Sequence, residues 1–108
     1  MSSAVSSRVE TSVAMNELTD PVAAAIQHWL CGYVAQVLAV GLDEIDPEEK
    51  FDRQGLDSSA AVGLAGDLGT WIGREVDPAL TYDFPTIASV SAELARQAEI
   101  RAALAGRI

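Results

Sequence analysis

Apolar residues recur at three- and four-residue steps in three separate stretches of this chain, and nowhere do they alternate as in a β-strand. That spacing places them on one face of an α-helix. The expected fold class is therefore all-α, a small bundle of three main helices plus one short helix. The positions expected to point inward are Ile26, Leu30, Tyr33, Val34, Val37 and Leu38, then Ala61, Leu64, Leu68 and Ile72, then Ile87, Val90, Leu94 and Ala98.

Capping residues set the expected bounds of the first main helix. Asp20 accepts backbone N–H groups well, and Pro21 is favoured at the first helical position, so the helix is expected to begin there. It runs to about Val40, and Gly41 ends it.

The later helices have similar signals. The second main helix is expected over 58–72 and closed by Gly73. A short helix or turn is expected over 81–84, where Pro85 stops it because the proline ring disfavours helix in the preceding residue. Thr86 then caps the final helix, which is expected to run to about Ala105.

The chain has 108 residues, the length of one domain. Residues 1–19 are rich in serine and small residues without a helical or strand period, so a flexible lead or linker is expected there. Residues 20–105 are expected to form the folded domain. A chain this short leaves little room for catalytic machinery, and neither a catalytic residue nor a metal site is expected.

The net charge of −9 opposes binding to nucleic acids and to anionic membrane surfaces. Seven acidic residues gather between the first two main helices, with Lys50 and Arg53 as the counter-charges, and this acidic segment favours partners with basic surfaces. The single cysteine, Cys31, cannot form an internal disulfide, and no signal peptide or membrane-length apolar stretch is present, which favours the cytoplasm. The seven acidic residues are Asp43, Glu44, Asp46, Glu48, Glu49, Asp52 and Asp57.

Asp57 and Ser58 place a hydroxyl group at the start of the second main helix. The first N–H groups of a helix are unpaired and carry partial positive charge, so a phosphate ester on Ser58 would be stabilised there. Aspartate and serine are also the preferred caps of any helix, and a purely structural role stays open at this point.

The segment from Gly55 to Ser58 reads Gly-Leu-Asp-Ser and resembles the phosphopantetheine attachment motif of acyl carrier proteins. Two further matches support the resemblance. The run Leu80–Thr86 resembles the Asp-Phe-Pro-Thr segment of polyketide-synthase carriers, and Ile45-Asp46-Pro47 with Phe51 fits the loop before the motif. The similarity covers roughly residues 22–98. Within the family, Trp71 to Arg74 is most similar to carriers paired with fatty acyl-AMP ligases.

The resemblance implies a non-catalytic acyl carrier domain over 20–105. Coenzyme A would supply a covalent 4′-phosphopantetheine on Ser58, within the cofactor motif of Gly55, Leu56 and Asp57. The Asp57 carboxylate would also serve the modifying enzyme and its metal ion. The implied partners are a phosphopantetheinyl transferase, an acyl-loading enzyme such as a fatty acyl-AMP ligase or an acyltransferase, and a ketosynthase or downstream synthase module. The carrier itself is expected to be a monomer.

Two further sets of residues are expected to surround the arm. Ser59, Val62 and Ala65 fall off the inward stripe and form the expected partner face, although carriers commonly have leucine where this chain has Ser59. Candidates for an acyl-chain pocket are Leu64, Leu80, Phe84 and Val90.

Two alternatives remain at this stage. A peptidyl carrier of a nonribosomal peptide synthetase would have the same chemistry with aminoacyl cargo, but its motif usually has glycine where this chain has Leu56. A small helical interaction module without a prosthetic group would use Ser58 only as a capping residue.

Overall fold

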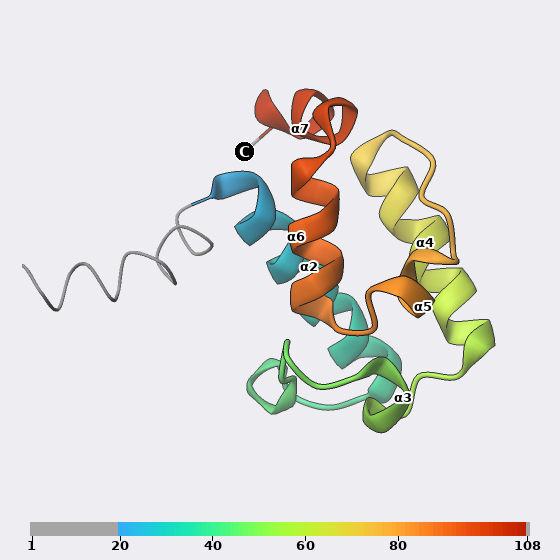
Figure 1. Cartoon of the computed structure of the whole chain (residues 1–108). Coiled ribbons are helices and arrows are strands. Elements are labelled where there is room, and N and C mark those ends of the chain that lie inside the picture. Colours follow the sequence, from blue (N-terminus) through green and yellow to red (C-terminus); the bar gives the residue numbers. More distant parts are fainter. Residues whose placement is uncertain (1–19, 108) are drawn as a thin grey trace, which may run out of the picture.

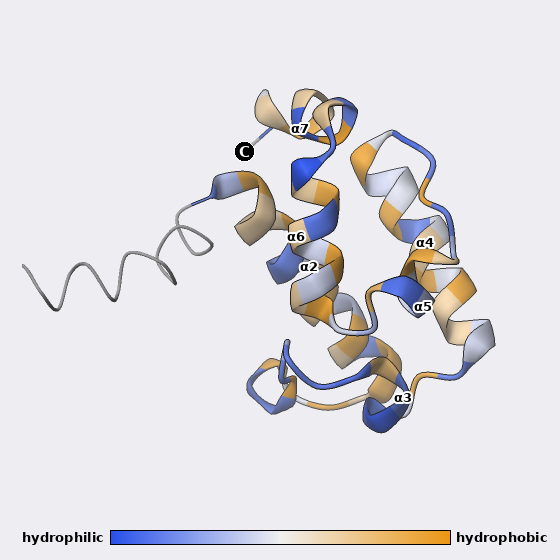
Figure 2. Cartoon of the chain, viewed as in Figure 1, coloured by the Kyte–Doolittle hydropathy of each residue, from blue (hydrophilic) through white to orange (hydrophobic). Residues whose placement is uncertain are grey.

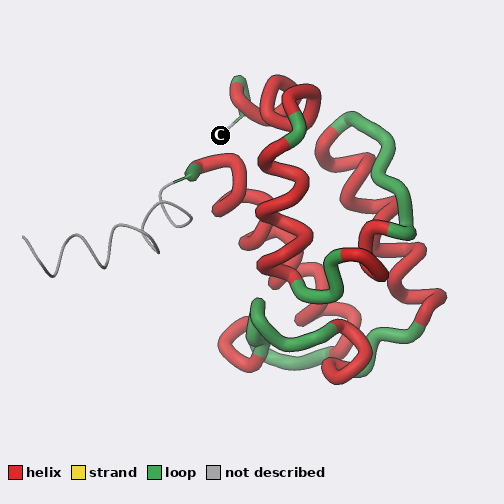
Figure 3. The backbone as a smooth tube through the Cα atoms, in the orientation of Figure 1, coloured by secondary structure: helices red, strands yellow, loops and turns green. Residues whose placement is uncertain are grey.

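The computed structural model describes residues 20–107, and its regular structure is helical throughout (Figures 1 and 3). The elements are α2 (Pro21–Leu38), the 3₁₀ turn η1 (Leu42–Glu44), α3 (Phe51–Gln54), α4 (Ser58–Ile72), α5 (Leu80–Asp83), α6 (Ile87–Arg96) and α7 (Ala98–Ala105). The expected all-α fold class is therefore confirmed. The interpretation of residues 1–19 as a linker lies outside the described residues.

Apolar stripes of α2, α4 and α6 meet to form one core (Figure 2). Leu30 on α2, Leu68 on α4 and Ile87 on α6 each have no exposed side-chain surface. Burying each such side chain contributes about 2 kcal/mol to folding. Val37 is 47% exposed, so its expected inward position was wrong, because α2 ends too soon after it for another element to cover this turn.

The final helix is two helices rather than one. Gln97 is extended, with φ −83° and ψ 124°, and the chain turns there from α6 into α7. In a straight continuation of α6, Ile100 would lie about 120° and Leu104 about 80° around the helix axis from Leu94, away from the centre of the apolar stripe. The turn instead buries Ile100 and Leu104 in the core and leaves Ala98 exposed, so both the single helix and the inward Ala98 were wrong.

Two arginines attach α7 and the residues after it to the rest of the bundle. The Arg101 guanidinium donates to Asp20 Oδ2 at 2.9 Å and to the Ala95 carbonyl at 2.8 Å. Arg107 donates to the Ile72 carbonyl at 3.1 Å, at the end of α4. In Figure 1, α7 lies across the end of the bundle opposite α3. The structure thus ties the C-terminal helix to the start of α2 and to the ends of α4 and α6.

The first helix begins as expected and ends differently. Asp20 caps it, accepting the Val22 N–H at 3.0 Å. The helix ends at Ala39, which adopts a left-handed conformation with φ 58°, and not at Gly41, whose φ is −73°. The Val40 N–H donates back to the Ala35 carbonyl at 3.0 Å, which closes the turn two residues early.

Replacing Ala39 with glycine is expected to raise the free energy of unfolding by about 1 kcal/mol, because glycine adopts the left-handed conformation without a steric penalty. Urea unfolding followed by circular dichroism measures the change. Ala24→Gly, at an exposed position inside α2, is the control and is expected to lose about 1 kcal/mol. A loss of stability in both variants would contradict the assignment of Ala39 as the helix end.

An aromatic stack joins α2 to α4. The rings of Trp29 and Tyr33 are stacked at 5.1 Å, and those of Trp29 and Trp71 at 5.5 Å. The Tyr33 hydroxyl donates to Asp67 Oδ2 at 2.6 Å. This hydrogen bond, together with partial burial and the negative charge of Asp67, raises the pKa of Tyr33 to about 12. Trp71 therefore serves to pack helices together.

Because the folded pKa of Tyr33 lies above the ordinary value of about 10, the hydrogen bond contributes full stability below pH 10, and this contribution is lost as the pH rises towards about 12. We expect the phenolate absorbance of Tyr33 to titrate near that upper value. A Tyr82→Phe background leaves Tyr33 as the chain's one tyrosine. Adding Asp67→Asn should move the titration downwards. An unchanged titration would contradict the role of Asp67.

Candidate functional site

Ser58 is the first residue of α4 and is exposed to solvent, as is Ser59. Asp57 directly before it is the N-cap, and Asp57 Oδ1 accepts the Ala60 N–H at 2.8 Å. This capping satisfies one of the unpaired amides at the helix start and leaves the serine hydroxyl free on the surface. The helix therefore begins at the residue expected from the sequence.

The two residues before Asp57 hold the serine in place. Gly55 has φ 103° and ends α3 in the left-handed conformation, where a side chain would be strained. Leu56 is only 6% exposed and belongs to the core, and its N–H donates to the Phe51 carbonyl at 3.0 Å. Gly55 supplies the turn and Leu56 anchors it, so each residue of the motif has a local structural reason.

Backbone hydrogen bonds bring together the segment before Ser58 and the segment around Thr86. Lys50 and Thr86 form an isolated antiparallel bridge. Next to it, the Phe51 N–H donates to the Pro85 carbonyl at 2.9 Å. The segment that leads into Ser58 thus lies beside the segment that follows α5, although the two are far apart in the sequence.

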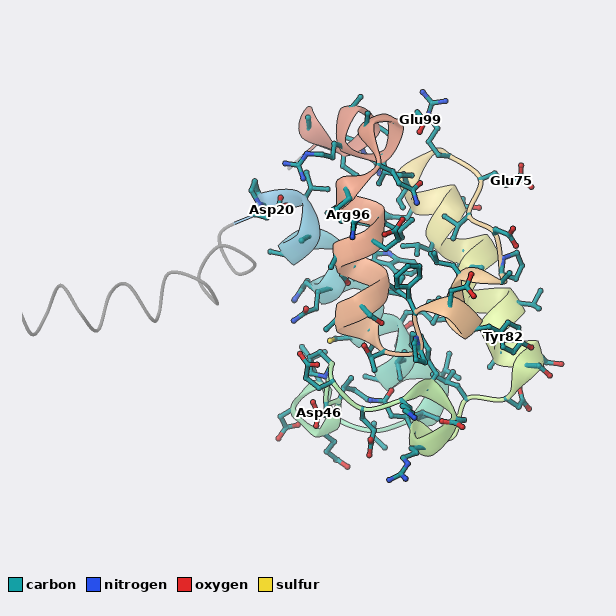
Figure 4. All side chains as sticks on the ribbon, in the orientation of Figure 1. Asp20, Asp46, Glu75, Tyr82, Arg96 and Glu99 are labelled. Carbon is teal, nitrogen blue, oxygen red and sulfur yellow. The ribbon has the colours of Figure 1, made fainter. Side chains whose placement is uncertain are left out.

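A hollow of about 490 Å³ opens between these segments and the first turns of α4. Ser58 lies in its wall, with Phe51, Leu56 and Pro85 as apolar wall residues. Figure 4 shows Tyr82 on α5 beside this end of α4, and its side chain is 73% exposed. Lys50 also lies in the wall of the hollow. Sequence reasoning missed this hollow, and the Lys50–Thr86 bridge that forms it has no signal in either segment alone.

The four acyl-pocket candidates fill the core. Leu64 and Val90 are each 1% exposed, and Leu80 and Phe84 pack against the same cluster. None of the four lines the hollow beside Ser58. Their contact with an acyl chain stays a prediction, and the structure shows them first as packing residues.

Two of the three residues expected on the partner face are exposed to solvent. Ser59 is exposed, and Val62 is 57% exposed one turn further along α4. Ala65 is 1% exposed, so its assignment to a partner face was wrong. The reason lies after α4, where the chain folds back along the helix and buries Val76 in the same core. Whether Ser59 and Val62 contact a partner stays a prediction.

Within residues 20–107, no group of three or more His, Cys, Asp or Glu side chains is arranged to hold a metal ion. In the same part of the chain, no helix has both the length and the apolar character needed to cross a bilayer. The acidic segment before α4 lies on the surface at the α3 end, where Figure 4 labels Asp46.

The family model described as a phosphopantetheine attachment site matches residues 28–94. The chain belongs to this family of carrier proteins. Such a carrier bears a covalent 4′-phosphopantetheine group and is a substrate of other enzymes, not a catalyst itself. Carrier domains of this family interact in general with phosphopantetheinyl transferases and synthase enzymes.

This carrier is similar to two curated relatives, an acyl carrier protein and a polyketide synthase subunit. It is 48% identical over 48 residues to the acyl carrier protein TtuC of Teredinibacter turnerae, covering 44% of this chain and 55% of that protein. It is 36% identical over 72 residues to one of the subunits of the phenolphthiocerol/phthiocerol polyketide synthase of Mycobacterium tuberculosis, covering 67% of this chain and 4% of that synthase protein. The carrier thus spans about half of the first relative and a small part of the second.

Two solved structures share its fold. Asl1650, an acyl carrier protein from Anabaena with a variant phosphopantetheinylation-site sequence, aligns with a TM-score of 0.64 and 44% identity over 68% of this carrier and 83% of that chain. A free-standing peptidyl carrier protein from Acinetobacter baumannii aligns with a TM-score of 0.63 and 35% identity. The alignment covers 67% of this carrier and 90% of that chain. Acyl and peptidyl carriers therefore match this fold about equally well.

The observed site fits the prosthetic group of the family. Ser58 presents an exposed hydroxyl, the start of α4 favours an anion, and a hollow with apolar walls and a cation lies directly beside the serine. When bound, the group supplies a terminal thiol that carries cargo as a thioester. Ser58 would hold the group covalently through Oγ. The side chains that line the hollow would contact it.

Proposed function

We propose that this protein is an acyl carrier whose 4′-phosphopantetheine arm is attached to Ser58. The observation that carries the proposal is the exposed Ser58 hydroxyl at the first position of α4, beside a hollow large enough for part of the arm. The structural roles of Gly55, Leu56 and Asp57 support it, because together they hold that hydroxyl at the surface.

In the attachment step, Ser58 Oγ attacks the phosphorus that carries pantetheine in coenzyme A. A bond forms between Oγ and phosphorus, the phosphoanhydride bond breaks, and 3′,5′-adenosine bisphosphate leaves with the electron pair. The hydroxyl proton passes to the transferase. The phosphodiester that remains lies where the helix start favours negative charge. Asp57 lies next to the serine. The family resemblance implies that the Asp57 carboxylate contacts the transferase and the metal ion that the transferase binds.

The choice of acyl over aminoacyl cargo rests on Leu56 and on the relatives. Leu56 stands where peptidyl carriers usually have glycine. The two curated relatives named above are an acyl carrier and a polyketide synthase. The matching peptidyl carrier structure is the observation that favours the alternative, aminoacyl cargo.

Partner enzymes follow from the same proposal. A fatty acyl-AMP ligase or an acyltransferase loads the arm, and a ketosynthase or another synthase module receives the acyl group, in polyketide, fatty acid or related lipid biosynthesis in the cytoplasm. Exposed Val62 supplies a small apolar contact close to the arm, and exposed Ser59 adds a polar one. The acidic segment steers basic partner surfaces towards it. The arm raises the effective concentration of the cargo at each partner's active site.

The mass of the cargo tests this function. The protein is purified from the cells that make it, and the arm is ejected from the intact protein in the mass spectrometer. We expect phosphopantetheine masses extended by acyl groups that lack an α-amino nitrogen. Mild hydroxylamine, which cleaves thioesters, should return all of them to the unloaded arm. Aminoacyl masses would establish the peptidyl alternative, and a chain without any arm would favour the interaction module.

A further inference from the structure

Lys50 is the only lysine in the sequence, and the fold fixes its backbone on two sides. It forms the bridge to Thr86 and is the N-cap residue of α3. The Arg53 and Gln54 N–H groups both donate to the Lys50 carbonyl at 3.0 Å. A residue held in this way presents its side chain from a constant position.

Lys50 and Ser58 line the same hollow of about 490 Å³. Among residues 20–107, the other charged residues in its wall are Asp52 and Asp57, so Lys50 is the one cation of this part of the chain that lines it. Arg53, the second cation of the acidic segment, lines a different hollow together with Glu44 and Glu49. The two cations of this segment therefore face different surroundings.

A second groove offers the arm another route. It follows the outer face of α4, lined by Val62, Gly66 and Thr70, and reaches Arg74 after the end of the helix. Lys50 does not line it. The cation of this groove thus lies beyond the far end of α4, whereas the cation of the hollow lies at the end that carries Ser58.

We propose, on the basis of the function proposed above, that Lys50 binds the phosphodiester of the arm on Ser58 and directs the arm into the hollow between α3 and α5. The phosphodiester keeps one negative charge at neutral pH, and the lysine ammonium is a compact cation with three hydrogen-bond donors. The apolar walls formed by Phe51 and Pro85 suit the two methyl groups of the pantoate unit, and Tyr82 lies further along the same wall.

The single lysine makes the test direct. Protein labelled with ¹³C-lysine gives one lysine Cε–Hε signal, and this signal is recorded before and after treatment with coenzyme A, Mg²⁺ and a phosphopantetheinyl transferase. We expect the Lys50 signal to shift when the intact mass gains the arm. Ser58→Ala treated in the same way is expected to leave the signal unchanged. Backbone amide shifts should move at Thr81 and Tyr82 and stay constant at Gly66 and Thr70.

Arg53→Gln provides the matched control for Lys50→Gln, because each removes one positive charge from the same acidic segment. With a ¹³C,¹⁵N-labelled arm, Lys50→Gln is expected to lower the heteronuclear NOE of the arm towards that of free pantetheine, and Arg53→Gln to leave it unchanged.

The two proposals fail in different ways. A gain in mass with an unchanged Lys50 signal, or with amide shifts along Gly66 and Thr70, would overturn the role of Lys50 and leave the carrier function standing. A folded protein that gains no mass would overturn the carrier function and this inference with it.

Discussion

Replacing Gly69 with alanine is expected to lower the free energy of unfolding by about 2 kcal/mol, which is a large share of the stability of a small domain. A Cβ atom at this position would lie 2.8 Å from the Arg74 carbonyl oxygen and 3.3 Å from the Val76 nitrogen. Both are backbone atoms of the loop that folds back along α4, so neither can move as freely as the end of a side chain. The strain should outweigh the gain in helix propensity from alanine, which is about 1 kcal/mol.

Gly66→Ala is the matched control for this substitution. Gly66 lies one turn earlier on the same helix and is exposed, and no described atom from outside its own stretch of the helix lies within 4 Å of the Cβ position. The control variant should therefore gain about 1 kcal/mol from helix propensity alone. Urea unfolding of both variants measures the two changes. If Gly69→Ala were stabilised as much as Gly66→Ala, the close approach of the loop to α4 would be wrong.

The loop also explains one error of the sequence analysis. Ala65 is small and lies off the main apolar stripe, a pattern typical of a surface position. The chain after Gly73 returns along α4 and buries Val76, and this covers the face on which Ala65 lies. Which face a return loop covers depends on contacts between segments, and the helical period of α4 contains no information on it.

Helix starts were predictable because their causes are local. Asp20, Asp57 and Thr86 each accept hydrogen bonds from backbone amides two or three residues ahead, and the sequence shows both partners together. The helix ends were less predictable. Ala39 adopts a conformation that glycine would be expected to occupy, and the break at Gln97 has neither glycine nor proline to mark it. That break is explained by the burial of Ile100 and Leu104, a tertiary effect.

The candidate site also has one part that the sequence predicts and another part that depends on contacts between distant segments. The sequence predicts that Ser58 begins the second main helix after the capping residue Asp57, and α4 begins at Ser58. The hollow required the pairing of Lys50 with Thr86, which connects two distant segments. Lys50 was visible in the sequence only as a counter-charge in the acidic segment, and its place in the wall of the hollow needed the fold.

Removing the Ser58 hydroxyl should abolish attachment of the arm completely, because no other atom of that residue can form the bond to phosphorus. Ser58→Ala is expected to keep the fold, since Asp57 still caps α4 and the replaced side chain is exposed. Ser59→Ala is the matched control, with the same chemical change one position along the helix. Circular dichroism of both variants confirms that α4 and the other helices are retained.

The intact mass of the three proteins after incubation with coenzyme A, Mg²⁺ and a broad-specificity phosphopantetheinyl transferase tests the central claim most directly. Wild type and Ser59→Ala are expected to gain one phosphopantetheine each, and Ser58→Ala none. A gain that persists in Ser58→Ala and disappears in Ser59→Ala would move the attachment to the neighbouring serine. A folded wild-type protein that gains no mass would contradict the carrier function itself.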